Sequence, residues 1–227
     1  VDQTLGMSIS TYVGTGSNAT IGHGLGVIPE FVIIKNMGTG QGWQCYHKGV
    51  GNTKAFYLDN ANVPDASSTY WQNTTPTSSV ISIGSNAQCN QSSQPLVCYA
   101  FAPSQFISIG SYEGNSNANG TFIPTLNSLG VPIQPVWWLH KCIDTGLSWY
   151  ILDSVSQTYN VLGPQVLSPD TTEATPSTTA TYREADFVTG GVKIRGAGDQ
   201  INNSNTHIYM AIGTPIIDVD GRIIAGR

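Results

Sequence analysis

The chain carries the same pattern of residues twice. The matched segments, at one offset (149 − 43 = 106), are 31–35 with 137–141, 39–40 with 145–146, and Trp43 with Trp149. Flanking blocks follow in the same order, because 10–14 matches 110–114 and 96–101 matches 208–212. Such a unit is much longer than the roughly 20 to 50 residues of a solenoid repeat. Each copy is therefore expected to be a small domain with its own core.

The restart of the pattern predicts where one domain ends and the next begins. We predict a first repeat over residues 1–103, a second over 104–215, and a C-terminal tail over 216–227. In the tail, two Ile-Ile pairs flank an Asp-Gly step, a composition typical of a β-hairpin.

Short apolar or alternating runs, separated by Gly, Asn and Pro, predict strands throughout. The clearest runs are 31–35, 43–47, 80–84, 96–102, 192–196 and 207–212. No window carries a helical apolar stripe over ten residues. The expected fold class is all-β, with two tandem antiparallel β-sandwich units related by internal duplication. Residues common to both copies, Lys35 with Lys141 and Trp43 with Trp149, are expected to determine the fold, with both tryptophans in a core.

Composition restricts the classes of partner. Charged residues are only 10% of the chain, against roughly 25% in an ordinary domain. With 9 Lys and Arg against 14 Asp and Glu, the net charge is −5, which argues against nucleic acid. No apolar run approaches the roughly 18 residues of a membrane span, so we expect no membrane insertion.

Four cysteines, Cys45, Cys89, Cys98 and Cys142, show no metal-binding spacing. We therefore predict neither a metal site nor a cofactor. Buried free thiols are the favoured interpretation of all four, and a disulfide between Cys89 and Cys98 across a hairpin is the alternative.

Several segments together resemble a repeated domain of bacteriophage tail fibres and other virion surface proteins, especially of phages that infect aquatic bacteria. The segments that carry the resemblance are 14–26, 29–36, 46–47, 51–54 and 71–80 in the first copy and 110–115, 149–154, 159–161 and 208–211 in the second. It extends over nearly the whole chain, 1–227. It implies a structural component assembled in the host cytoplasm and exposed on the virion.

Three functions are compatible with this resemblance. The preferred one is a non-enzymatic tail fibre segment that takes part in host attachment, contacting other virion proteins and a host cell-surface glycan. A homotrimer is expected, because threefold association along a fibre hides exposed strand edges. The alternatives are a decoration protein that clamps capsomers on the capsid and a polysaccharide-cleaving spike domain.

Candidate catalytic groups are sparse in the sequence. The turn residue His23 has no partner serine or cysteine in a nucleophile elbow. The other histidines, His47, His140 and His207, are expected in a core or interface. Carboxylates cluster in the second copy, where solvation is their ordinary role; these are Asp153, Asp170, Glu173, Glu184 and Asp186. We predict no catalytic residue and no enzyme activity.

Aromatic and amide side chains are the candidates for binding sugar, since rings stack on sugar faces and amides bond hydroxyls. In a strand, one of two adjacent aromatic residues faces outward. The predicted glycan-binding residues are Tyr70, Trp71, Asn115, Asn117, Asn119, Asn202, Asn203 and Asn205. For the adjacent pair Trp137 and Trp138, packing on the two sides of a buried sheet is preferred over binding.

Overall fold

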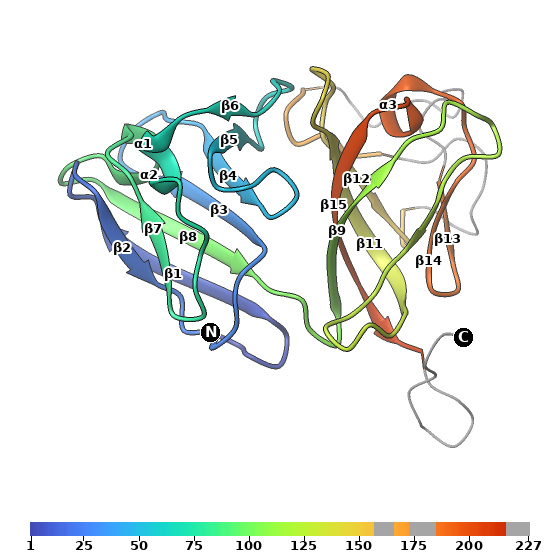
Figure 1. Ribbon diagram of the computed structural model, residues 1–227, viewed down its shortest axis with the longest axis horizontal. Helices are drawn as coiled ribbons and strands as arrows, with labels where there is room; N and C mark the ends of the chain where they lie inside the picture. The colour runs from blue at the N-terminus through green and yellow to red at the C-terminus, as the bar shows by residue number, and fades with distance from the viewer. Residues whose placement is uncertain (157–165, 173–184, 217–227) are drawn as a thin grey trace. The chain divides into compact units, whose positions relative to one another are not determined.

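The computed structural model describes residues 1–156, 166–172 and 185–216. The chain divides into two compact units, Val1–Ala102 and Pro103–Arg227 (Figure 1). In the described residues, regular structure is mostly antiparallel strand, with three helices of four residues each. The predicted all-β class is confirmed. The predicted tail hairpin lies almost entirely outside the described residues.

Unit 1 is built on one six-stranded antiparallel sheet in the order β1-β8-β3-β4-β5-β6 and a two-stranded sheet β2-β7. The strands of the large sheet are β1 (Met7–Val13), β3 (Phe31–Asn36), β4 (Trp43–His47), β5 (Lys54–Tyr57), β6 (Asp65–Ala66) and β8 (Pro95–Phe101). The small sheet joins β2 (Ala19–Gly22) to β7 (Val80–Ile83). Two short helices flank β7 in the chain, α1 (Ser68–Trp71) before it and α2 (Ala87–Asn90) after it.

The core of unit 1 collects side chains from both of its sheets. Val32 and Ile34 of β3 are fully buried, as is Ile81 of β7, and all three belong to one apolar cluster. The helices close this cluster, because Trp71 of α1 and Cys89 of α2 are part of it. Since successive residues of a strand point to opposite faces, the continuous apolar run of β3 also makes the second face of its sheet apolar.

Unit 2 has a four-stranded antiparallel sheet in the order β9-β15-β11-β12 and a three-stranded sheet β10-β14-β13. The strands are β9 (Ile107–Glu113), β10 (Phe122–Pro124), β11 (Ile133–Cys142), β12 (Tyr150–Asp153), β13 (Ala185–Val188), β14 (Gly191–Ile194) and β15 (Thr206–Pro215). One helix, α3 (Asp199–Asn202), precedes β15. The core again draws on both sheets, with Trp138 of β11 packed in one cluster with Val192 of β14.

The two large sheets share strand order along the chain, since β1-β8-β3-β4 corresponds to β9-β15-β11-β12. A specific contact also recurs. The Nζ of Lys35 lies 5.6 Å from the ring centre of Trp43, and the Nζ of Lys141 lies 5.7 Å from that of Trp149. Each ammonium also donates to a backbone carbonyl six residues further on, Gln41 and Leu147 respectively.

The prediction that both repeated tryptophans are core residues is correct for only one. Trp149 is 1% exposed, whereas Trp43 is only partly buried. Trp43 begins β4, and its ring stacks on Tyr99 with 6.3 Å between centroids. Tyr99 faces away from the cluster of Val32 and Ile34, so Trp43 covers the second face of the sheet and not the core.

The structure shows whether the cysteines are free or paired. All four are free and buried, so the alternative Cys89–Cys98 disulfide is wrong. Burial raises the pKa of the Cys89 and Cys98 thiols to about 12, because a thiolate is poorly solvated in an apolar core. These thiols are small apolar packing groups.

Candidate functional site

Tyr70 and Trp71 do not form an outward surface, so that part of the predicted glycan site is wrong. Tyr70 is 9% exposed and Trp71 is 1% exposed, and both belong to the core of unit 1. The physical reason is the helix α1, which Ser67 caps by accepting from the backbone N–H of Thr69. In one helical turn, adjacent residues do not point to opposite faces, so both rings pack inward.

The other predicted residues come together in unit 2. Asn202, the last residue of α3, is fully buried and connects the segment 115–119 to the segment that follows α3. Its Oδ1 accepts from the backbone N–H of Asn115 at 3.0 Å, and its Nδ2 donates to the carbonyls of Asn117 and Gly196, both at 2.8 Å. Asn202 therefore holds the candidate surface in place from the interior of unit 2, and it does not itself contact a ligand.

We call the segments 115–120 and 202–205 the asparagine loops. Their backbones also contact directly, because Ser116 N–H donates to the carbonyl of Asn202 at 2.6 Å and Gly114 N–H donates to that of Asn205 at 3.1 Å. A Cβ on Gly114 would lie 1.8 Å from the carbonyl oxygen of Asn203, so glycine is required for this close approach.

The amides of Asn115, Asn117 and Asn119 are exposed. Two consecutive turns order them, because the Oδ1 of Asn115 accepts from Asn117 N–H at 3.1 Å and the Oδ1 of Asn117 accepts from Asn119 N–H at 2.8 Å. Beside them, the hydroxyls of Ser116 and Ser204 lie 2.9 Å apart across the two loops. The asparagine loops thus present a row of ordered polar groups.

The same anchor occurs in unit 1. Asn90, at the end of α2, is fully buried. Its Oδ1 accepts from Thr15 N–H at 2.8 Å, and its Nδ2 donates to Ser17 at 2.6 Å and Gly84 at 2.9 Å. The two buried asparagines therefore use the same three kinds of bond to hold equivalent loops.

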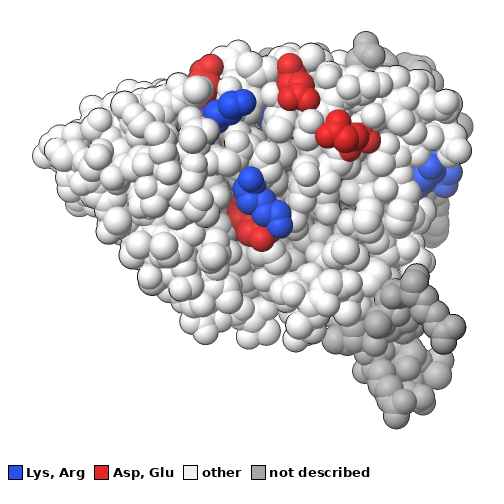
Figure 2. Space-filling view, in the orientation of Figure 1, with Lys and Arg blue, Asp and Glu red and all other residues white. Residues whose placement is uncertain are grey.

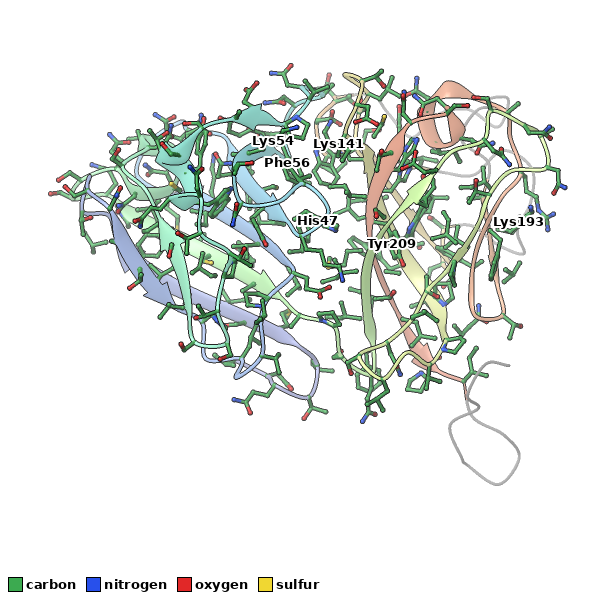
Figure 3. The ribbon with its side chains drawn as sticks, viewed as in Figure 1. His47, Lys54, Phe56, Lys141, Lys193 and Tyr209 are labelled. Atoms are coloured by element: carbon green, nitrogen blue, oxygen red, sulfur yellow. The ribbon has the colours of Figure 1, made fainter. Side chains whose placement is uncertain are left out.

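Phe122 is a candidate contact residue that the sequence interpretation missed. It is 48% exposed and begins β10, immediately after the first asparagine loop. It pairs across the sheet with Lys193, whose Nζ donates to the Oδ1 of Asn119 at 2.9 Å and to the carbonyl of Gly120. Figure 3 labels Lys193 on β14. The available signal was alternation, because Ile123 is buried in the core while Phe122 is not.

Asn203 links the asparagine loops to a buried histidine. His207 Nε2 donates to the Oδ1 of Asn203 at 2.8 Å, and the His207 ring stacks on Tyr112 with 4.8 Å between centroids. The ring centroid of His140 lies 6.1 Å from that of His207, and the His140 ring stacks on Trp138 with 4.3 Å between centroids. Both histidines are fully buried, so their expected core placement is confirmed.

Burial controls the charge of this histidine pair. It lowers the pKa of His140 well below its usual value, with the nearby His207 and Lys141 adding to the effect. Burial also lowers the pKa of His207 to about 4, although the backbone of Asn203 and the charge of Asp144 oppose this shift. Both imidazoles are therefore neutral at pH 7.

The remaining candidate groups have structural partners. His23 is buried, donates from Nε2 to the Thr77 carbonyl at 3.0 Å and accepts at Nδ1 from Leu25 N–H. Asp186 and Arg195 form an ion pair with 2.5 Å between Oδ2 and Nε. The other carboxylates are either engaged by backbone N–H groups, as for Asp153 and Asp170, or lie outside the described residues, as for Glu173 and Glu184.

Charge is thinly spread over the described surface. Figure 2 shows a few charged side chains, some of them beside one of opposite charge, on an otherwise uncharged face. In the described ranges, no three His, Cys, Asp or Glu side chains are grouped as metal ligands. The helices of that part of the chain are also too short to span a membrane.

The structure therefore defines an all-β protein whose two units each hold a polar loop on a buried asparagine. Residues 1–214 match the family model described as a domain of unknown function, DUF7483, and the chain belongs to that family. This single model spans both units. No curated protein and no solved structure matches the chain.

Proposed function

We propose that the chain is a non-enzymatic structural protein of the bacteriophage virion surface, a tail fibre segment that attaches to host glycan. The virion assignment rests on the sequence resemblance. The attachment surface rests on the asparagine loops, whose exposed amides are fixed by the buried Asn202. Rigid polar loops on a β scaffold are a common basis of recognition, because a positioned loop loses little entropy on binding.

The architecture supports a building-block role. Each unit is a β-sandwich of one large and one small sheet, and the two arose by internal duplication. The matching strand orders and the repeated Lys–Trp and asparagine contacts support this origin. A duplicated scaffold with few charges suits a component whose task is to hold its shape and present loops.

A sugar ring fits the chemistry of the surface. Hydroxyl groups exchange hydrogen bonds with amides such as Asn117, and the C–H face of a sugar packs on an aromatic ring such as Phe122. Unlike Tyr70 and Trp71, Phe122 lies beside the asparagine loops, because it pairs with Lys193 and Lys193 donates to the Oδ1 of Asn119. It replaces Tyr70 and Trp71 in the proposed site.

A glycan array probed with the full-length protein tests this site. We expect binding to a restricted set of glycans, and Phe122→Ala and Asn117→Ala should each weaken it at least about tenfold, equivalent to about 1.4 kcal/mol. Asn18→Ala is the matched control, because Asn18 is exposed in the equivalent loop of unit 1. Equal losses in all three variants, or no binding by the wild type, would contradict the proposed site.

The non-enzymatic part of the proposal has its own test. Incubation of the protein with each bound polysaccharide should release no reducing ends. Release of reducing ends by the wild type but not by Asp186→Asn would transfer the assignment to the polysaccharide-cleaving alternative. Asp186 is a carboxylate on β13, where it pairs with Lys193 of β14 and forms an ion pair with Arg195.

A further inference from the structure

Strand β1 is a free sheet edge. It lies at the end of the large sheet of unit 1, pairs with β8 on one side, and has no neighbouring strand on the other within the described chain (Figure 1). Its seven residues, MSISTYV, include no charge and no proline, and its register with β8 has no bulge. Charged residues, prolines and bulges normally protect an edge strand from pairing, and β1 has none of them.

The direction of the free backbone groups follows from the hydrogen bonds at the two ends of β1. Met7 exchanges bonds with Asp2, N–H to carbonyl, at 2.8 and 3.0 Å, on the side away from β8. Gly14 N–H donates to the Gln94 carbonyl, toward the chain that leads into β8. Since the backbone groups of successive residues alternate sides, Ile9, Thr11 and Val13 point theirs outward.

The equivalent edge of unit 2, strand β9, is protected at both of its ends. The outward groups at the start of β9 are occupied, because Ser104 N–H donates to the Ile107 carbonyl at 3.1 Å and the Ser104 hydroxyl accepts from Ile107 N–H at 3.2 Å. At its end, the carbonyl of Glu113 accepts from the Thr121 hydroxyl at 2.8 Å, and Glu113 adds a charge. Strand β1 shares only the first of these features, through the bonds between Asp2 and Met7, so its edge is less protected than that of β9.

We propose that β1 pairs with β1 of a second copy of this chain, antiparallel about a twofold axis at Thr11. In that register Thr11 faces Thr11 of the second copy and Ile9 faces its Val13. All three outward positions are then hydrogen-bonded pairs, which exchange both N–H···O bonds. The strand is thus complementary to itself.

The side chains favour the same pairing. Ile9 is 50% exposed and Val13 is 67% exposed, and the pairing places one against the other. Thr–Thr and aliphatic cross-strand pairs are favourable, and an uncharged strand brings no like charges together. A second copy meets these requirements without any further component.

The mass of the full-length protein in solution is the first test. Light scattering should give 48.2 kDa (2 × 24.1) for the wild type. Thr11→Lys and Thr11→Glu should each give the monomer mass, because like charges then meet at the axis, and their equimolar mixture should restore the dimer. Ser111→Lys, at the equivalent exposed position of β9, should leave the dimer intact.

A covalent trap tests the register. Directly paired residues have Cα atoms about 5.5 Å apart, which a disulfide can span. Thr11→Cys should give a disulfide-linked dimer on mild oxidation, while Ser111→Cys should not. A monomeric wild type, a trimer of 72.3 kDa (3 × 24.1), or equal cross-linking of both variants would overturn the proposal.

Discussion

Asn90 and Asn202 are fully buried, although asparagine is mostly a surface residue. Each uses both ends of its amide to fix a loop that the sheet alone would leave loose. A buried amide is retained when its bonds are complete, and its removal leaves several backbone groups without partners. These two residues therefore hold the loops of their units in place.

Asn202→Ala should lower the free energy of unfolding by about 2 to 4 kcal/mol, because it leaves the N–H of Asn115 and the carbonyls of Asn117 and Gly196 unsatisfied. Urea denaturation measures the change. Asn205→Ala, on the same loop but not fully buried, should change it by no more than about 0.5 kcal/mol. Equal effects would show that Asn202 is not the anchor.

The repeated tryptophans should differ in their contribution to stability. Trp149→Ala should cost about 3 to 5 kcal/mol, because the fully buried ring leaves a cavity. Trp43→Ala should cost clearly less, since its ring is partly exposed and covers the second face of the sheet. The same denaturation measurement compares them, and a larger loss for Trp43 would contradict these placements.

At the level of residues, the sequence predicted most of the loop surface but not its mechanism. The Asn-rich composition located both asparagine loops, because turn residues are recognisable locally. It could not separate Asn202, which anchors, from Asn117, which is exposed, since only the fold decides which amide is buried. Tyr70 and Trp71 were misplaced because α1 is a single turn with no detectable helical period.

At the level of elements, β11 and β15 bring His140 and His207 into the core of unit 2. The folded-state pKa of each lies below the usual value of 6.5. The unfolded chain therefore binds more protons than the folded one in this range, and stability falls as pH drops below about 6.5. For His207 the fall continues to a pH of about 4 and is on the order of 3 kcal/mol.

Other groups of unit 2 whose pKa is shifted leave this sign unchanged in the range between about pH 6.5 and pH 4. Burial raises the pKa of Tyr112 well above its usual value, so that ring is neutral throughout the window. Hydrogen bonds from Ser156 and Val155 lower the pKa of Asp153 despite some desolvation, and its contribution is lost only below about 4. Desolvation raises the pKa of Asp170. The folded state therefore takes up this proton more readily than the unfolded chain, and on acidification this group offsets a small part of the loss of stability.

His140→Phe should flatten the decline in stability between pH 7 and pH 5, because phenylalanine fills the same stacked position beside Trp138 without taking up a proton. Urea titrations at several pH values measure the slope. His207→Phe should flatten it as well, but it also removes the bond to Asn203 and so lowers stability at pH 7. Unchanged slopes in both variants would contradict the assignment of the acid sensitivity to this pair.

The elements themselves were largely predictable from sequence. Strands such as β3, β4 and β15 follow from apolar runs bounded by turn residues, and the structure confirms them. The helices were not predicted, because four residues held by a cap at Ser67 or Asn86 carry no periodic signal. The short strand β10 was also missed, because its three residues end in proline.

At the level of the whole molecule, the large sheets of the two units have the same strand order but differ in how their edges are protected. The repeat in the sequence anticipated the shared strand order, because both copies keep the residues that set it. It did not anticipate that β9 is protected at both ends and β1 only at its start, since Ser104 and Thr121 lie outside the matched blocks. The family model extends over both units.

The most direct test of the virion proposal is cryo-electron microscopy of phage particles labelled with an antibody against this chain. The proposal predicts label along the tail appendages. Label at regular positions on the capsid shell would instead identify a decoration protein, and particles that carry no label at any position would contradict a role on the virion surface.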